Sequence, residues 1–264
     1  MAHSPTPTRT TAPATTAPLD PQDRARLAAA VDRAARLDPD TGTAAVLGAL
    51  LPPAELRELA GLCVYDHSAL LLFPPDHDAL LVALADLGLS AGALVPSVVV
   101  KQRLAERHGP ALAGADVRIT HASVPGRGGA AGSVVEIFSC PAAQAGPDVR
   151  AAERRAETEQ HTALRVVSTA PDALDRAVSL LVDRAGFCPD GGGYNPHEQR
   201  AAGGTTVRYL ARVGTAPDRL VRLELKRHGR HGGDAPVPAV WSEDVARVYR
   251  ANATHANATH EGEL

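Results

Sequence analysis

The spacing of apolar and polar residues changes along the chain, and over residues 21–62 it is the spacing of a helix. Apolar side chains recur every three or four positions, the spacing of one helix face, at Leu27, Val31, Ala34 and Leu37. Asp20 before Pro21 favours a helix start, and two more helices are expected near 43–51 and after Pro52. Residues 21–62 are therefore predicted to form a helical cap on the main body. Residues 1–20, rich in Thr, Pro and Ala, are predicted to be a disordered tail.

The period changes at Cys63, where patterns typical of β-strands begin. Residues 63–140 predict the order strand, helix and three strands, with the clearest elements at 64–73, 75–87, 117–124 and 133–139. The second strand is expected within 94–113. There Val98–Val100 favours a strand, whereas Lys101–His108 has the composition of a helix.

The same order follows again after a partly helical linker at residues 141–158. Residues 159–228 predict a strand, a helix, a glycine-rich bend through Gly191–Gly193 and further strands, at 160–168, 171–185, 204–213 and 219–227. Residues 229–264 are predicted to form a turn, a short helix near 242–249 and a tail. The chain therefore reads as an α+β protein built from two similar units.

A four-residue phrase opens both units. It reads His67-Ser68-Ala69-Leu70 in the first unit and His161-Thr162-Ala163-Leu164 in the second. Each unit also closes on a strand with one acid among apolar residues, Glu136 in the first and Glu224 in the second. The histidine and the carboxylate thus occupy the same places in both units.

Two histidines and two carboxylates suit a divalent metal ion. A carboxylate on a central strand is costly to bury unless it is paired or bound to a metal. Imidazole favours Fe, Zn, Ni or Co, and carboxylate also accepts Mn. A single strand histidine or glutamate is more often an ordinary core or surface residue. The repetition of both residues favours a metal site formed by His67, Glu136, His161 and Glu224.

The motifs DHSAL…VVEIF and QHTALRV…RLELK resemble the vicinal oxygen chelate superfamily. That superfamily includes glyoxalase I, methylmalonyl-CoA epimerase, extradiol dioxygenases, 4-hydroxyphenylpyruvate dioxygenase and metal-free antibiotic-binding proteins. The resemblance implies an α+β fold of two paired βαβββ modules with cupped mixed sheets, at residues 63–140 and 159–228. It also implies one metal site between the modules, and a small oxygenated substrate chelated through adjacent oxygens.

Three functions follow from the resemblance. An isomerase, epimerase or lyase uses all four residues as ligands, with Glu136 or Glu224 shuttling a proton. An Fe(II) dioxygenase uses only His67, His161 and Glu224, which leaves three coordination positions open. A metal-free binding or resistance protein needs none of them. The first two functions differ in whether Glu136 is a metal ligand, and we favour the isomerase or lyase.

Residues near the predicted ligands are candidates for substrate binding. Arg165 follows His161 by four positions on the same strand face, so it can anchor a substrate carboxylate. His121 is either an acid-base group or a solvent-exposed residue. Tyr194, with His197, either reaches the site from the glycine-rich segment or belongs to an ordinary loop. Asp66 is expected to point away from His67, because successive strand residues lie on opposite faces.

The composition of the chain argues against some classes of binding partner. The 264 residues carry a net charge of −3 and few aromatic residues, which disfavours nucleic-acid binding. The three cysteines lie far apart and indicate a reducing compartment. No apolar stretch reaches the roughly 18–20 residues that span a bilayer. The sequence therefore favours a cytoplasmic protein with a small-molecule substrate, and it indicates no oligomeric state.

Overall fold

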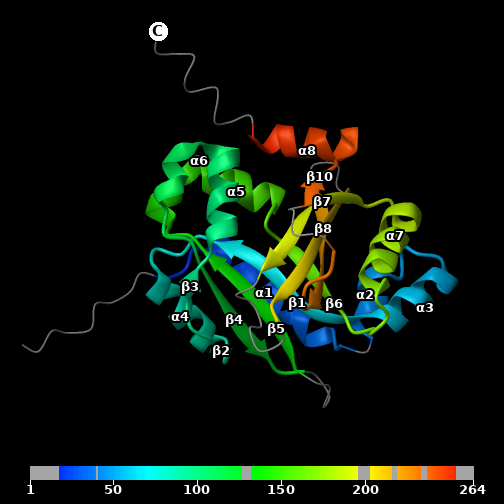
Figure 1. Ribbon diagram of the computed structural model, residues 1–264. Helices are drawn as coiled ribbons and strands as arrows, with labels where there is room; N and C mark the ends of the chain where they lie inside the picture. Colours follow the sequence, from blue (N-terminus) through cyan, green and yellow to red (C-terminus); the bar gives the residue numbers. More distant parts are fainter. Residues whose placement is uncertain are drawn as a thin grey trace, which may run out of the picture.

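A ten-stranded mixed sheet forms the centre of the protein (Figure 1). The structure, a computed structural model, describes residues 18–39, 41–126, 132–195, 203–215, 219–232 and 237–253. Eight α-helices lie around the sheet in these ranges, so the fold is α+β as predicted. Most of the predicted N-terminal tail and the C-terminal tail fall outside the described residues.

The two halves of the sheet have the same strand order. The elements of the first half are β1 (Cys63–Leu72), α4 (His77–Asp86), β2 (Ser90–Ala91), β3 (Val95–Pro96), β4 (Arg118–Val124) and β5 (Ser133–Ser139). Those of the second are β6 (His161–Val166), α7 (Ala173–Ala185), β7 (Cys188–Asn195), β8 (Thr205–Val213) and β9 (Leu220–His228). In each half the first strand pairs in parallel with the last, and the last pairs antiparallel with the one before it. The first strands β1 and β6 pair antiparallel and join the halves, while the short β10 (Val237–Ala239) extends the second half beside β7.

The predicted cap consists of three helices that cover one face of both halves. They are α1 (Pro21–Arg36), α2 (Gly42–Leu47) and α3 (Pro53–Leu62), and the Asp20 side chain caps α1 by accepting from the Gln22 amide. Leu27 and Ala34 of α1 pack with α4 on the first half. The other two helices share a core with α7 on the second half (Figure 1).

The opposite face of the sheet is covered only in part. Over the first half lie α5 (Val98–His108), the 3₁₀ helix η1 (Pro110–Gly114) and α6 (Ala142–Ala156). Over the second half lies α8 (Glu243–Ala253), close to α5 and α6 (Figure 1). We call this end of the face the covered end. The candidate site residues lie beside it, in the middle of the sheet.

Two predicted elements, the possible strand at Val98–Val100 and the glycine-rich bend, differ in the structure. Val98–Val100 belongs to helix α5, because Val100 packs in the core under that helix, and the second strand is reduced to the short β2 and β3. The linker at 141–158, predicted to be partly helical, contains helix α6, which is interrupted at Gly146 with φ 74°.

The glycine-rich bend is strand β7. A Cβ at Gly192 would meet the Val207 carbonyl oxygen of β8 at 2.5 Å, so glycine allows the neighbouring strand to approach. Among the described residues, no helix is long and apolar enough to cross a membrane.

Candidate metal centre

The register of four central strands brings His67, Glu136, His161 and Glu224 to one face of the sheet. Ala69 of β1 pairs with Glu136 of β5 on one side and with His161 of β6 on the other. Ala163 of β6 pairs in the same way with His67 and with Glu224 of β9. Directly paired residues share a face. The small alanines therefore leave room between two histidines and two glutamates.

The donor atoms of these four side chains converge. The His161 Nε2 atom lies 3.5 Å from a Glu224 carboxylate oxygen and 3.7 Å from Glu136 Oε2. The His67 Nε2 atom also lies 3.7 Å from Glu136 Oε2. Ligand atoms of His67, His161 and Glu224 all lie within 4.8 Å of one another. All four residues are buried.

Each imidazole forms a hydrogen bond through Nδ1, the nitrogen that points away from the centre. This bond indicates that the other nitrogen, Nε2, faces the centre with a lone pair. The His67 Nδ1 atom lies 2.9 Å from Asp66 Oδ2, and the His161 Nδ1 atom lies 3.1 Å from the Glu159 carbonyl oxygen. Both acceptors require Nδ1 to carry the hydrogen in a neutral ring. Within the described part of the chain, both Nε2 atoms are buried without a hydrogen-bond partner. Lone pairs that face carboxylates at this distance fit a bound cation.

The electrostatics of the centre also favour a positive charge. Burial lowers the pKa of His67, but Glu136, Asp66 and Glu224 outweigh it and leave this pKa raised. Burial raises the pKa of Glu136, yet His67, His121 and His161 lower it to about 2. Burial lowers the pKa of His161 to about 3 against the opposing effect of Glu136. Glu136 and His161 are therefore in ligand-competent forms at neutral pH.

Asp66 does not point away from His67, contrary to the sequence prediction. The register of β1 against β6 shifts between Tyr65 and His67, so a β-bulge interrupts the alternation of faces. The Asp66 carboxylate also receives Arg165 Nε at 3.2 Å and Lys226 Nζ at 2.6 Å. Arg165 thus lies beside the centre, with 35% of its side chain exposed.

His121 lies at the solvent side of the centre. It pairs with Glu136 across β4 and β5, and its Nε2 atom is 3.0 Å from Glu136 Oε1. Its side chain is 56% exposed. His121 is therefore solvent-exposed and also contacts Glu136, and its acid-base role stays a prediction. We call this side, which His121 and Arg165 border, the open end.

Tyr194 lies outside the cluster. Tyr194 pairs with Thr206 of β8. Thr206 lies three positions before Tyr209, and Tyr209 pairs with Glu224 and shares its face. Alternation places Tyr194 on the other face. Its hydroxyl donates to the Gly203 carbonyl oxygen at 2.7 Å, and Arg230 lies 4.6 Å from its ring. His197, the other candidate from this segment, falls outside the described residues.

Sequence reasoning missed Tyr209, which is opposite Glu224. Its ring is 6.2 Å from that of His161, and the guanidinium groups of Arg103 and Arg222 lie 4.7 and 5.7 Å from it. Burial and the nearby Glu224 raise the pKa of the Tyr209 hydroxyl. Alternation along the strand predicted at 204–213 could have placed Tyr209 on the face of the cluster only once the register was known.

A buried ionic network at the covered end was also missed. The fully buried Glu159 carboxylate lies 2.6 Å from Arg107, 3.4 Å from Arg103 and 3.7 Å from Arg222. Glu153 of α6 lies 3.0 Å from Arg107, and its carboxylate also contacts His108 and Thr158. These partners are far apart in sequence, and no local motif marks them. The network supports the turn that presents His161.

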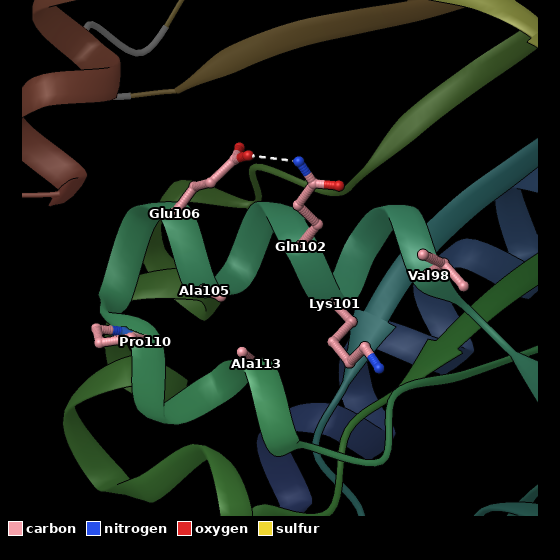
Figure 2. A pocket seen from close by; sticks show the side chains of 7 residues that line it. All are labelled: Val98, Lys101, Gln102, Ala105, Glu106, Pro110 and Ala113. Atoms are coloured by element: carbon pink, nitrogen blue, oxygen red, sulfur yellow. Dashed lines mark hydrogen bonds between the residues drawn. The ribbon is translucent and has the colours of Figure 1, made fainter.

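A separate cavity of about 380 Å³ lies between α5 and η1 (Figure 2). Val98, Ala105 and Ala113 line it, together with Gln102 and Glu106, which are hydrogen-bonded at 2.8 Å. None of the four clustered residues contributes to this cavity.

No family model matches the sequence, and no curated protein matches it. Solved structures of methylmalonyl-CoA epimerase match part of this chain at low similarity. One selenomethionine structure has a TM-score of 0.35 and 14% identity, covering 64% of this chain and 98% of that one. The Streptomyces coelicolor enzyme in complex with 2-nitronate-propionyl-CoA has a TM-score of 0.33 and 15% identity, covering 64% and 99%. Similarity at this level does not assign an activity.

Proposed function

We propose that the protein is a metal-dependent isomerase or lyase that acts on a small molecule chelated through adjacent oxygens. The observation that supports this proposal is the pair of buried Nε2 atoms, on His67 and His161, that face two carboxylates without hydrogen-bond partners among the described residues. Four donor groups from four strands fit a divalent first-row ion.

His67, His161 and Glu224 would hold the ion, and Glu136 would complete the set. When bound, such an ion stabilises negative charge that develops on a substrate oxygen. Removal of a proton from the carbon next to a carbonyl creates that charge. The acceptor of the proton is a carboxylate of this chain.

Glu136 is the better placed of the two carboxylates for proton transfer. Its Oε2 atom faces both imidazoles, while its Oε1 atom is 3.0 Å from the exposed His121. A proton taken by Glu136 can therefore pass through His121 to solvent or return to the substrate. Glu224 comes from the other half of the sheet and can return a proton in an epimerisation.

A specific observation favours an Fe(II) dioxygenase as the second candidate. The ligand atoms of His67, His161 and Glu224 form a compact group, whereas one oxygen of Glu136 is engaged by His121. Two histidines and one carboxylate are the ligand set of non-haem iron oxygenases. In this function Glu136 is dispensable as a ligand.

Arg165 supports a substrate that carries a carboxylate. It lies four residues after His161 on the same strand face, and its side chain is 35% exposed at the open end. An arginine binds a carboxylate through two parallel hydrogen bonds. His121 borders the same end and is the second substrate-side residue that we propose.

The test uses the wild-type protein and Glu136→Gln, each loaded with Co²⁺, Ni²⁺, Zn²⁺ or Mn²⁺. Both proteins are incubated in D₂O with 2-hydroxy ketones and 2-keto acids, and solvent exchange at carbon is followed by NMR. The proposal predicts metal-dependent exchange in the wild type that Glu136→Gln abolishes. Matched samples loaded with Fe²⁺ under anaerobic conditions are then exposed to O₂.

Oxygen consumption that survives Glu136→Gln would overturn the isomerase in favour of the dioxygenase. If no divalent ion binds, and small molecules bind equally to the wild type and His161→Ala, both enzyme proposals fail. A metal-free binding protein then remains.

A further inference from the structure

We propose that Asp66 is a positioning residue of the metal centre, which fixes the His67 ring so that its Nε2 lone pair faces the ion. This inference rests on the proposed metal-dependent function. Asp66 does not touch the convergent donor atoms itself. It acts on the rear nitrogen of a ligand, where a carboxylate sets both the ring orientation and the tautomer.

The β-bulge makes this contact possible. In a regular strand Asp66 and His67 would lie on opposite faces of the sheet. The register shift between Tyr65 and His67 removes that constraint and places Asp66 Oδ2 2.9 Å from His67 Nδ1. Bulges next to functional sites commonly reorient a side chain in this way. The irregularity of β1 therefore has a specific consequence at the metal centre.

Two cations from the second half hold the carboxylate in place. Arg165 Nε of β6 lies 3.2 Å from Asp66 Oδ1, and Lys226 Nζ of β9 lies 2.6 Å from Asp66 Oδ2. These contacts fix the carboxylate plane, since each oxygen has at least one donor. The second half of the sheet thereby orients a ligand that belongs to the first half.

A purely structural role of Asp66 predicts a different effect of its removal on metal affinity. If Asp66 only joined β1, β6 and β9 by ion pairs, its loss would lower stability and leave the metal affinity of the folded protein unchanged. If it positions His67, neutralising it weakens metal binding even where the fold persists. Supporting groups of this kind commonly change metal affinity by about 10–100-fold.

The experiment compares Asp66→Asn and Asp66→Ala with Asp116→Asn. Asp116 is a matched control, because it accepts from His77 at 3.2 Å and from Arg118 at 3.0 Å at a distance from the centre. The full-length proteins are titrated with Co²⁺ and followed by calorimetry and visible absorption. We expect affinity about 10–100-fold weaker in both Asp66 variants, an altered Co²⁺ spectrum, and no change in Asp116→Asn.

A second measurement does not depend on the variants folding. Long-range ¹H–¹⁵N correlation spectra of the metal-free wild type at alkaline pH report which nitrogen of His67 carries the hydrogen. We expect the Nδ1–H tautomer. The opposite tautomer, or Co²⁺ affinity in folded Asp66→Ala within twofold of the wild type, would overturn the role of Asp66. Failure of the wild type to bind any ion would instead overturn the proposed function.

Discussion

The two halves of the sheet present the same pair of proposed ligands, a histidine and a glutamate, but support the histidines in different ways. His67 is held by the Asp66 side chain at the open end, and that carboxylate is itself held by Arg165 and Lys226. His161 is held by the backbone carbonyl of Glu159 at the covered end. Equivalent ligand positions therefore coexist with unrelated supports, and only the first support depends on a side chain that mutation can remove.

The pKa values of the two imidazoles are also shifted in opposite directions, although both supports act to raise them. Despite burial, Glu136, Asp66 and Glu224 leave the pKa of His67 raised. Burial lowers the pKa of His161 to about 3, with His67 and Arg222 acting in the same direction. The open end therefore stabilises positive charge next to the centre, and the covered end keeps its histidine neutral.

The two halves should differ most in how much each support contributes to the free energy of unfolding. Glu159→Gln at the covered end removes the buried carboxylate that Arg103, Arg107 and Arg222 share. Breaking buried ion pairs in this way costs about 3–5 kcal/mol of the free energy of unfolding. Asp66→Asn at the open end, where the carboxylate is partly exposed, is expected to cost about 1 kcal/mol. Urea unfolding of both variants measures the two costs. Equal costs would contradict the distinction between a structural and a positioning support.

Acid should destabilise the covered end. Burial raises the pKa of Glu153, but Arg107 and His108 outweigh it and leave this pKa below its ordinary value of 4.5. A lowered folded-state pKa contributes stability that is present above 4.5 and is lost as the pH falls towards the lowered value. Urea unfolding between neutral pH and pH values below 4.5 should therefore show a steeper loss in the wild type than in Glu153→Gln.

The control for this acid dependence is Asp148→Asn, an exposed acid on the same helix α6. It should follow the wild-type pH dependence. If Glu153→Gln also followed it, the buried network would not be the source of the acid sensitivity.

The open end should control substrate binding. Arg165→Gln removes the proposed carboxylate anchor, and the loss of a charged hydrogen bond of about 1.5–3 kcal/mol corresponds to a KM increase of roughly 10–100-fold. In protein saturated with metal ion the kcat should change less, because Lys226 still contacts the Asp66 carboxylate that orients His67. Steady-state kinetics with the substrate found by D₂O exchange measures both. Arg118→Gln, an exposed ion-paired arginine away from the centre, is the control.

The smallest effect is expected at Tyr209. Tyr209→Phe removes a buried hydroxyl beside Glu224 and keeps the ring between Arg103 and Arg222. We expect a Co²⁺ affinity weakened by about tenfold, at the lower limit for a group that supports a ligand. An unchanged affinity and spectrum would show that Glu224 is oriented by the sheet alone.

The sequence predicted the four clustered residues because strand alternation and a repeated phrase are local signals. The repetition marks His67, Glu136, His161 and Glu224 as equivalent positions of two units, and the pairing register of the strands brings them to one face. Asp66 could not be placed in the same way, since a bulge depends on how two strands pair. The run Gly191–Gly193 predicts a bend because glycine usually interrupts strands, whereas in the structure Gly192 allows a neighbouring strand to approach.

The helix and the ion pairs at the covered end could not be predicted, because packing and long-range contacts determine them. The helix at Val98–His108 contains a β-branched start, and the packing of Val100 decides its conformation. The partners of Glu159 come from α5 and β9, and such long-range ion pairs leave no periodic signal in the sequence.

The central claim is that one divalent ion is held by an imidazole and a carboxylate from each half. Calorimetric titration of metal-free protein with Co²⁺ tests it most directly, with His67→Ala, His161→Ala and the control His77→Ala, whose side chain contacts Ser139 and Asp116 outside the centre. We predict one ion per chain in the wild type and in His77→Ala, and affinity reduced by more than about 100-fold in each of the other two variants. No binding in the wild type, or binding that either ligand variant retains unchanged, would contradict the shared metal centre.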